Sequence, residues 1–398
     1  MKAIELFSGA GGLGLGISRA GFLPVDIVEW DRWCCDTIRE NRARGAEWVK
    51  NWPTPREGDV RAFSFTHLEE KVDLVAGGPP CQPFSMGGRH RAQHDHRDMW
   101  SEAVRVVRET KPRAFIFENV KGLTRETFSI YFSYIYLQLS YPMIALRDGE
   151  KWLDHRARLE QHHTSNGSAD LAYRVLPPKV LNAANFGVPQ KRERVFFVGF
   201  RSDIGVEWSF PRETFSRDAL LWSQYRSGDY WHAHRIAKRH RPENPKAKIA
   251  AERLSSNPDA RPWRTARDAF VGLGEPELGN INLDHADHRF QPGARSYPGH
   301  TGSTLDEPAK TLKAGVHGVP GGENMLRRSD GTVRYFTIRE SARLQTFPDD
   351  FVFHGSWTET MRQLGNAVPV DLATAIARSV HEHLGRAHPT LQPVTGRC

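Results

Sequence analysis

The sequence predicts an α/β fold built on a mostly parallel sheet that helices cover on both faces. From Lys2 to about Arg201, short apolar runs alternate with longer amphipathic stretches, as in repeated strand–helix units. Strands that are apolar throughout are typical of parallel sheets, because both faces of such sheets are buried. The chain has 398 residues, 39% of them hydrophobic, which is long enough for two domains.

Short apolar runs mark the candidate strands, and amphipathic stretches mark the candidate helices. The expected strands are Ala3–Phe7, Pro24–Glu29, Leu74–Ala76, Ala114–Glu118, Val180–Asn182 and Val195–Phe200. The expected helices are Gly12–Ala20, Trp33–Asn41 and Met99–Glu109, with another around Val370–His383. The polar segment Asp148–Asp170 has no apolar periodicity, so we expect an exposed loop there.

The composition changes after Arg201. Gly, Pro, His and Arg become frequent, and clear periodicity is lost until about Tyr335. Between Tyr230 and Arg267 the sequence contains ten Lys or Arg residues and three Asp or Glu residues, which gives a local net charge of +7. Such a run is usually a solvated surface, and that reading stays open beside a binding function.

Charge and cysteine content narrow the class of protein. Lys and Arg number 55 against 47 Asp and Glu, for a net charge of +8, which permits a polyanionic partner without requiring one. Cys34, Cys35, Cys81 and Cys398 form no CxxC pair and no Cys/His metal spacing, so we expect a reducing compartment and no bound metal. The first residues lack the apolar stretch and cleavage site of a signal peptide, and no apolar run is long enough to span a membrane, so we expect neither a signal peptide nor a membrane span.

The first expected strand leads into a glycine-rich turn. Gly9-Ala10-Gly11-Gly12-Leu13-Gly14 follows Ala3–Phe7 and opens the next helix, where free backbone N–H groups can face a ligand. Glu29 stands at the end of the second strand, where a carboxylate can accept hydrogen bonds from a ribose. The ring of Trp30 can lie against an adenine. The pattern predicts an adenosine-containing cofactor and leaves NAD and S-adenosylmethionine both open.

Two further strands end in reactive side chains. Leu74–Ala76 is followed by a Gly-Gly-Pro-Pro turn and Cys81, so this cysteine is expected at the ligand-binding edge of the sheet. A buried structural cysteine is the commoner case, but this turn is not core sequence, which favours a nucleophile. Glu118 ends the next strand and is a candidate acid. Alternation before Val195–Phe200 places Gln190, Arg192 and Arg194 on one face.

Taken in order, these motifs resemble those of the C5-specific DNA cytosine methyltransferases. The matching segments are Phe7–Gly14, Glu29-Trp30, Gly58–Val60, Pro80–Gln82, Glu118–Val120, Gln190–Arg194, Arg339–Gln345 and Gly365–Pro369. The resemblance implies a Rossmann-like, S-adenosylmethionine-dependent catalytic domain and a smaller target-recognition domain. Residues 1–200 and 335–398 would form the catalytic domain, and residues 201–334 the second domain, which would lie across the DNA from the first.

The resemblance also implies a set of cofactor-binding residues. They are Phe7, Gly9, Ala10, Gly11, Gly12, Leu13, Glu29, Trp30, Asp59, Val60, Pro80, Asn366 and Val368. The implied catalytic residues are Cys81, Glu118, Arg192 and Arg194. Cys81 would add to cytosine C6, protonated Glu118 would bind N3, Arg194 would hold O2, and Arg192 would support Cys81 and its neighbours. This chemistry requires that the cytosine be flipped out of the helix.

The implied partner is double-stranded DNA. Gln82, Ser85 and Arg97 are expected to contact DNA, and Ser85–Asp98 is a candidate closing loop. Lys238 and Arg239 are expected to bind phosphates, and Arg295, within Pro292–Gly322, to read bases. We also expect a monomer in the bacterial cytoplasm, with a cognate restriction endonuclease as a possible functional partner.

Three other classes of protein compete with this interpretation. An NAD-dependent oxidoreductase shares the glycine turn and Glu29 but gives no role to Cys81 or to the paired arginines. A tRNA cytosine methyltransferase shares the motifs, although the long region from Arg201 to Arg334 favours DNA. A DNA-binding protein without activity is disfavoured because Cys81 and Glu118 are both present.

Overall fold

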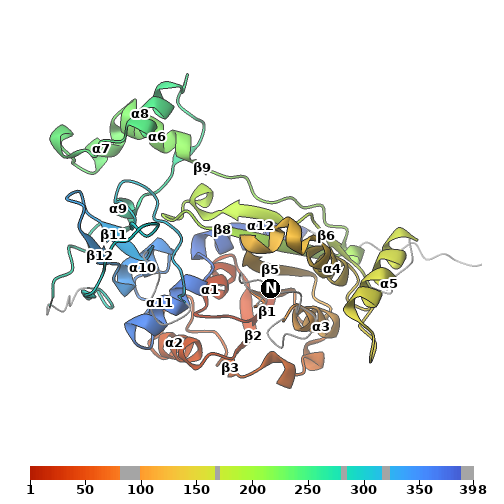
Figure 1. The fold of residues 1–398 in the computed structure, drawn as a ribbon. Coiled ribbons are helices and arrows are strands. Elements are labelled where there is room, and N and C mark those ends of the chain that lie inside the picture. The colour runs from red at the N-terminus through yellow and green to blue at the C-terminus, as the bar shows by residue number, and fades with distance from the viewer. Residues whose placement is uncertain (81–98, 166–170, 279–284, 316–322, 387–398) are drawn as a thin grey trace, which may run out of the picture.

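A central sheet of eight strands forms the core of the computed structural model, which describes residues 1–80, 99–165, 171–278, 285–315 and 323–386 (Figure 1). The strand order is β3-β2-β1-β4-β5-β8-β6, and β7 also pairs with β8. The bounds are β1 Lys2–Leu6, β2 Leu23–Glu29, β3 Arg56–Glu57, β4 Leu74–Gly77, β5 Ala114–Val120, β6 Tyr173–Val175, β7 Lys179–Asn182 and β8 Glu193–Arg201. Each expected strand is therefore present, with shifts of one or two residues at its ends.

The sheet is parallel from β3 to β5 and antiparallel around β8. The expectation of a mostly parallel sheet is confirmed. The antiparallel pairing has a direct consequence for the site, because it sets Val120 at the end of β5 opposite Arg194 near the start of β8. Glu118 and Arg194 are thereby brought to the same edge of the sheet.

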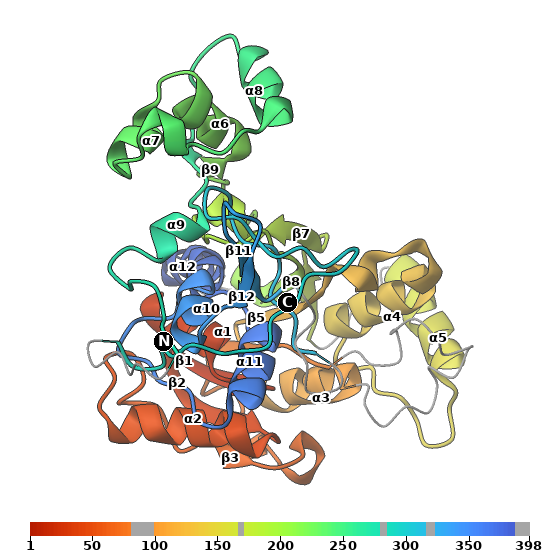
Figure 2. The same cartoon turned by 60° about the vertical axis from the view of Figure 1, so that its left-hand side comes forward.

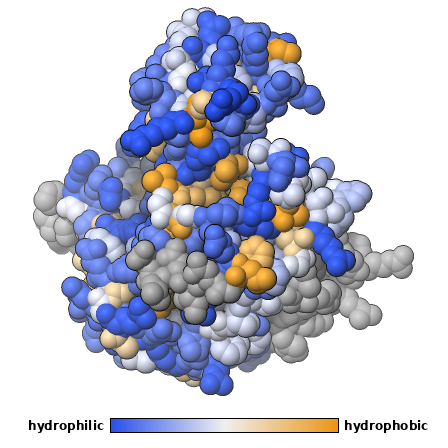
Figure 3. Space-filling model, turned by 90° about the vertical axis from the view of Figure 1, so that its left-hand side faces the viewer, coloured by the Kyte–Doolittle hydropathy of each residue, from blue (hydrophilic) through white to orange (hydrophobic). Residues whose placement is uncertain are grey.

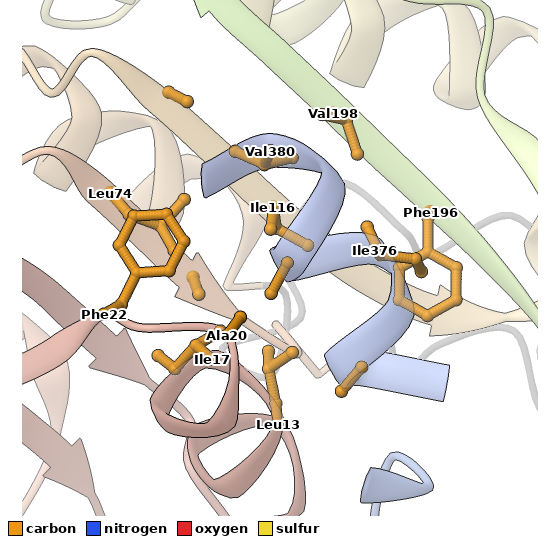
Figure 4. Packing of buried hydrophobic residues seen from close by; sticks show 14 of the residues in the cluster. Leu13, Ile17, Ala20, Phe22, Leu74, Ile116, Phe196, Val198, Ile376 and Val380 are labelled. Carbon is orange, nitrogen blue, oxygen red and sulfur yellow. The ribbon is translucent and has the colours of Figure 1, made fainter. Parts of the chain in front are cut away.

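Helices cover both faces, as expected. On one face, α1 (Gly12–Arg19) and α12 (Val370–Arg386) pack on alternate residues of the strands, such as Ile116 and Val198 (Figure 4). On the other face, α3 (Trp100–Thr110) and α4 (Ser129–Ser140) cover residues of the opposite parity, such as Phe115. Burial of both parities explains why these strands are apolar throughout.

The contact between α1 and α12 is unusually close. A Cβ atom added at Gly16 would lie 2.3 Å from the Cβ of Ala373, and one added at Gly12 would lie 2.4 Å from the carbonyl oxygen of Val368. Only glycine fits at either position. Leu13 and Ile17 of α1 meet Ile376 and Val380 of α12 beside this contact (Figure 4).

The segment expected as a loop at Asp148–Asp170 is largely helical, so that prediction was wrong. Helix α5 spans Trp152–Thr164 and packs against α4. Its buried residues are His155 and Leu159, and this narrow face gives the sequence too little apolar periodicity to reveal the helix. The His155 Nδ1 lies 2.8 Å from the hydroxyl of Tyr134, and this buried polar contact helps to fasten α5.

A small helical lobe stands apart from the sheet (Figures 1 and 2). It contains α6 (Arg217–Tyr225), α7 (Asp229–Ala233), α8 (Pro245–Glu252) and the paired two-residue strands β9 (Phe215–Ser216) and β10 (Arg261–Pro262). Small apolar clusters, one around Trp231 and another around Leu221, hold these helices together. Helices this short cannot show a long periodic pattern, which explains the loss of periodicity in the sequence.

The chain after the lobe returns to the main body. There α9 (Ala266–Ala269), β11 (Met325–Arg327) and β12 (Val333–Tyr335) precede α10 (Ile338–Leu344) and α11 (Trp357–Asn366). Side chains of this stretch share a core with α2 (Arg32–Ala43), which lies beside the parallel half of the sheet. Leu312 and Leu326 are buried in that core, so part of region 201–334 packs directly on the body that carries the sheet. Among the described residues, no helix has the length and apolarity to cross a membrane.

Candidate active site

The carboxyl end of β1 turns sharply into α1. Phe7 has a φ of 54°, which is rare for a residue with a side chain, and Gly9 and Gly11 also have positive φ, at 54° and 87°. Ala10 and Leu13 are buried, so this turn offers mainly backbone groups to a ligand. The geometry suits a turn that must approach a ligand closely.

Glu29 fixes this turn to the end of β2. Its carboxylate accepts hydrogen bonds from the backbone N–H groups of Gly9 at 2.7 Å, Trp30 at 2.9 Å and Asp31 at 2.8 Å. Burial raises the pKa of Glu29, and these three donors act in the opposite direction. The side chain of Trp30 is 75% exposed beside it, so an aromatic face is available next to a fixed carboxyl group.

Asp59 and Val60 follow β3 at the same edge. The N–H of Gly58 donates to the carbonyl of Glu29 at 2.9 Å, which places this turn next to β2. Val60 is buried, whereas Asp59 is half-buried and pairs with Arg61, which lowers the pKa of Asp59. The turn thus adds an ionised acceptor close to Glu29.

The end of α11 reaches the glycine turn from the other end of the chain. Asn366 is exposed at the last position of this helix, while Val368 is buried with its carbonyl oxygen against Gly12. The segments around Gly12 and Asn366, which the sequence analysis grouped as cofactor contacts, are therefore neighbours in space.

The turn after β4 lies against the end of β5. Asn119 donates from Nδ2 to the carbonyl of Pro79 at 2.9 Å, and a Cβ added at Gly78 would lie 3.3 Å from Oε2 of Glu118. Pro80 is exposed. Cys81 follows it in the chain, and the predictions for Cys81, Gln82, Ser85, Arg97 and the loop Ser85–Asp98 lie outside the described residues.

Glu118 and Arg194 form a buried ion pair. Nε of Arg194 lies 2.7 Å from Oε1 of Glu118, and the two side chains are only 11% and 9% exposed. The alignment of the pair does not meet hydrogen-bond geometry, so this oxygen has no hydrogen-bond partner in the described parts of the chain. Burial raises the pKa of Glu118, although Arg194 and Arg192 oppose the shift. A carboxyl group of this kind can hold a proton and present it to a ligand.

Arg192 is fully buried, and its terminal nitrogens bind backbone carbonyls. Nη1 donates to Leu312 at 3.0 Å, and Nη2 donates to Gly365 at 2.7 Å and Ala367 at 2.8 Å. These partners could not be predicted, because they come from segments more than a hundred positions away. The expected support of Cys81 by Arg192 stays a prediction.

The expected DNA contacts in region 201–334 are solvent-exposed. Lys238 and Arg239 lie in a single 3-10 turn of the lobe, and Arg295 lies in a segment without regular secondary structure. The face of the lobe seen in Figure 3 is mostly hydrophilic. The contact of these residues with DNA stays a prediction.

One buried group was missed in the sequence. Glu5 lies in the middle of β1, fully buried beneath Gly14 of α1, and burial raises the pKa of Glu5 to about 8. An acidic residue inside an otherwise apolar strand was the available signal. At neutral pH this carboxyl group is therefore mostly protonated, which makes its burial under the helix less costly.

The site brings the glycine turn after β1, the carboxyl group of Glu29 and a buried acid–arginine pair to one edge of the sheet, as in group-transfer enzymes of the doubly wound class. The family model of C-5 cytosine-specific DNA methylases matches residues 1–141 and 151–382. The chain belongs to this family and is a DNA (cytosine-5) methyltransferase.

Curated relatives are bacterial type II methyltransferases. The chain is 33% identical over 394 residues to M.PspPI of Psychrobacter sp., covering 96% of this chain and 80% of the relative. It is 32% identical over 384 residues to M.Eco47II of Escherichia coli, covering 95% and 78%. These similarities place the chain among the enzymes of restriction-modification systems.

Solved structures show the same fold. The Dnmt2 methyltransferase of S. pombe matches with a TM-score of 0.54 at 16% identity, covering 97% of this chain and 99% of that one. The methyltransferase EhMeth of Entamoeba histolytica matches with a TM-score of 0.55 at 12% identity, covering 96% and 98%. The expected α/β fold with a methyltransferase-type sheet is thereby confirmed.

Proposed function

We propose that this enzyme transfers a methyl group from S-adenosylmethionine to C5 of a flipped-out cytosine in a specific double-stranded DNA sequence, through a covalent adduct with Cys81. The observation that carries the proposal is the buried Glu118–Arg194 pair beside the Gly78–Pro80 turn that leads into Cys81. A carboxyl group whose pKa is raised by burial, placed next to a cation, suits a base that gains negative charge as it is attacked.

The residues at the mouth of the sheet fit S-adenosylmethionine. Glu29 offers a carboxylate for ribose hydroxyls, Asp59 offers an acceptor for the adenine, and the exposed ring of Trp30 offers a stacking face for adenine. Backbone groups of the Gly9–Gly12 turn and the side chain of Asn366 border the same place. When bound there, the cofactor supplies an electrophilic methyl group.

Each protein group then has a definable task. The Cys81 thiolate adds to C6 of cytosine, and the electron pair moves through the ring toward N3, where Glu118 donates its proton. Arg194 stabilises the charge at O2. Bound S-adenosylmethionine would supply the methyl group to C5, with cleavage of its S–CH3 bond and departure of its sulfur as a neutral thioether. Loss of the C5 proton to a base would then let the electrons of the C5–H bond expel the Cys81 thiolate, and the N3 proton would return to Glu118. Burial of the pair excludes water and strengthens these interactions.

The covalent step is tested with DNA that contains 5-fluorocytosine at the methylated position. Fluorine cannot leave as a cation, so we expect the wild-type enzyme to accumulate a stable protein–DNA adduct visible in a denaturing gel. Cys81→Ala should form none and should show no methyl transfer. Cys34→Ala, which changes a buried cysteine on α2, is the control and should behave as wild type. An adduct with the Cys81→Ala variant would refute the assignment.

Region 201–334 is proposed to select the DNA sequence, while residues 1–200 and 335–398 perform the chemistry. The lobe supports this division, because it stands clear of the sheet and carries exposed cations such as Lys238 and Arg239 (Figures 2 and 3). Arg295 and the rest of Pro292–Gly322 are proposed to read base edges. The enzyme is further proposed to act as a monomer in the bacterial cytoplasm, beside an endonuclease of the same specificity.

Two variants separate affinity from sequence selection. Neutralising Lys238 and Arg239 together should weaken binding to all DNA sequences and reduce the slope of log K against log salt by about 2. Arg295→Ala should instead relax the preferred site, at a cost of about 1–3 kcal/mol for the correct sequence. Binding titrations at several salt concentrations measure the first effect, and methylation profiles on a random-sequence library measure the second. An unchanged preferred site in every variant of this region would place sequence selection elsewhere.

A further inference from the structure

Three segments that are distant in the sequence meet around the side chain of Arg192. The first is residues 189–192, the lead into β8. The second is residues 309–314 of the proposed recognition region, and the third is the end of α11. Arg192 is fully buried, and among the described residues its guanidinium donates to no carboxylate. A buried cation without an ionic partner is costly, so its compensation by backbone carbonyls requires explanation.

The lead into β8 holds the recognition segment along several residues. Lys191 N–H donates to the carbonyl of Ala309 at 2.8 Å, and Ala309 N–H donates to the carbonyl of Pro189 at 2.9 Å. The Leu312 N–H donates to Oε1 of Gln190 at 3.1 Å, and its carbonyl accepts from Arg192 at 3.0 Å. Leu312 is thus held through both of its backbone polar groups.

The same guanidinium holds the end of α11. Nη2 of Arg192 donates to the carbonyl oxygens of Gly365 and Ala367. The negative end of the helix dipole favours a cation at this place. Gly365 also touches the recognition segment, since a Cβ there would lie 2.3 Å from the nitrogen of Ala314. Asn366 lies between the two carbonyls, and Val368 follows one residue later against Gly12 of the cofactor turn.

We propose that Arg192 is a positioning residue that sets the cofactor-contacting end of α11 and the recognition segment 309–314 in one register with β8, and that it does not itself touch the target base. The proposal rests on the proposed function of these segments. Arg194, two residues further along the chain and inside β8, pairs with Glu118 instead. Two arginines at the start of this strand therefore have separate tasks, one aligning the two binding surfaces and the other facing the reacting base.

Arg192→Lys tests this division, because one ammonium group cannot reach three carbonyls in the fork geometry of a guanidinium. We expect Kd for S-adenosylhomocysteine, measured by calorimetry, and KM for DNA each to rise about tenfold, as for the loss of one or two buried hydrogen bonds. We expect kcat at saturation to fall less than about threefold, because an interaction that only supports binding raises KM and spares kcat. Arg194→Lys should show the opposite division, with a large loss of kcat.

Hydrogen exchange of the free enzyme gives a readout that needs no catalysis. In Arg192→Lys, peptides covering residues 309–315 and 362–370 should both exchange faster, while those covering β4 and β5 should not. Lys191→Met is the matched control, since it removes only the surface ion pair with Glu307, just before the recognition segment, and should leave Kd, KM and the exchange rates near wild type. If Arg192→Lys does not fold, Gly365→Ala tests the same contact from the other side and should raise Kd and KM together.

The outcomes are distinguishable. A wild-type enzyme that methylates no DNA would refute the proposed function, while the exchange experiment would still test the contact. A large loss of kcat with unchanged Kd and KM would show that Arg192 acts at the reacting base or through Cys81, and would overturn the proposal. Unchanged exchange in either of the two peptides would also overturn it.

Discussion

Replacement of Glu118 by Gln is expected to lower kcat for methyl transfer by about 10²- to 10⁴-fold, the range for loss of a positioned acid. The amide keeps the size of the side chain and can still donate a hydrogen bond, but it cannot transfer a proton to the base. Affinity for S-adenosylhomocysteine should stay the same, because Glu118 lies at the end of β5 and the cofactor groups lie at β1 and β2. Single-turnover methylation with saturating DNA and cofactor measures the change.

The dependence of the methylation rate on pH tests which protonation state of Glu118 is active. Burial raises the pKa of Glu118, and the protonated form is the active one, so wild-type activity should persist below that pKa and fall as the pH rises through it. In Glu118→Gln this alkaline fall should be absent. Glu193→Gln is the control, because Glu193 is an exposed residue of β8 paired with Lys121 and should have a wild-type rate and profile. A Gln variant with a kcat within threefold of wild type would remove Glu118 from the mechanism.

Gly16→Ala is expected to lower the free energy of unfolding by about 1–3 kcal/mol. Alanine has a higher helix propensity than glycine, by about 1 kcal/mol, so propensity alone predicts stabilisation. The new methyl group would lie 2.3 Å from the Cβ of Ala373 and 2.8 Å from the nitrogen of Thr374. Because one neighbour is backbone, α1 and α12 must separate, and the contacts around Ile17 and Ile376 are lost with them. Urea unfolding followed by circular dichroism measures the change.

Gly385→Ala provides the matched comparison. Gly385 is also a glycine within a helix, but a Cβ there would have only Met1 Cε nearby, at an ordinary 3.7 Å. We expect this variant to be unchanged or up to about 1 kcal/mol more stable. Equal effects of the two substitutions would show that the close approach of α1 and α12 does not contribute to stability.

The strands and their reactive ends were predictable because they depend on local sequence. Apolar runs bounded by Gly, Pro and charged residues predicted β1, β2, β4, β5, β7 and β8. Because ligands bind at the carboxyl ends of parallel strands, the turn after β1, Glu29 and Glu118 were expected at the same edge of the sheet. The three-residue strand β6 was too short to be recognised. Helix α5 was missed because its buried face consists of His155 and Leu159, which give too weak a period.

Features that depend on distant partners could not be predicted. The alternation of Gln190, Arg192 and Arg194 was visible, but the different targets of Arg192 and Arg194 depend on Leu312, Gly365 and Glu118. The glycines of α1 predicted a cofactor turn, whereas the close approach of α12 that they also permit appears only when residue 373 is placed beside residue 16. Such contacts depend on how the chain is folded, and no local pattern in the sequence predicts them.

The neighbouring positions of α1 and α12 constrain how the protein is made. Arg19 of α1 pairs with Asp371 of α12, so the ribosome synthesises the helix that covers α1 only 352 positions after it. Until then Leu13 and Ile17 lack their partners Ile376 and Val380, and the cofactor turn lacks Val368. Residues 201–334 have been synthesised by that time. The glycine turn can therefore reach its final packing only after the region proposed to select the DNA sequence has been synthesised.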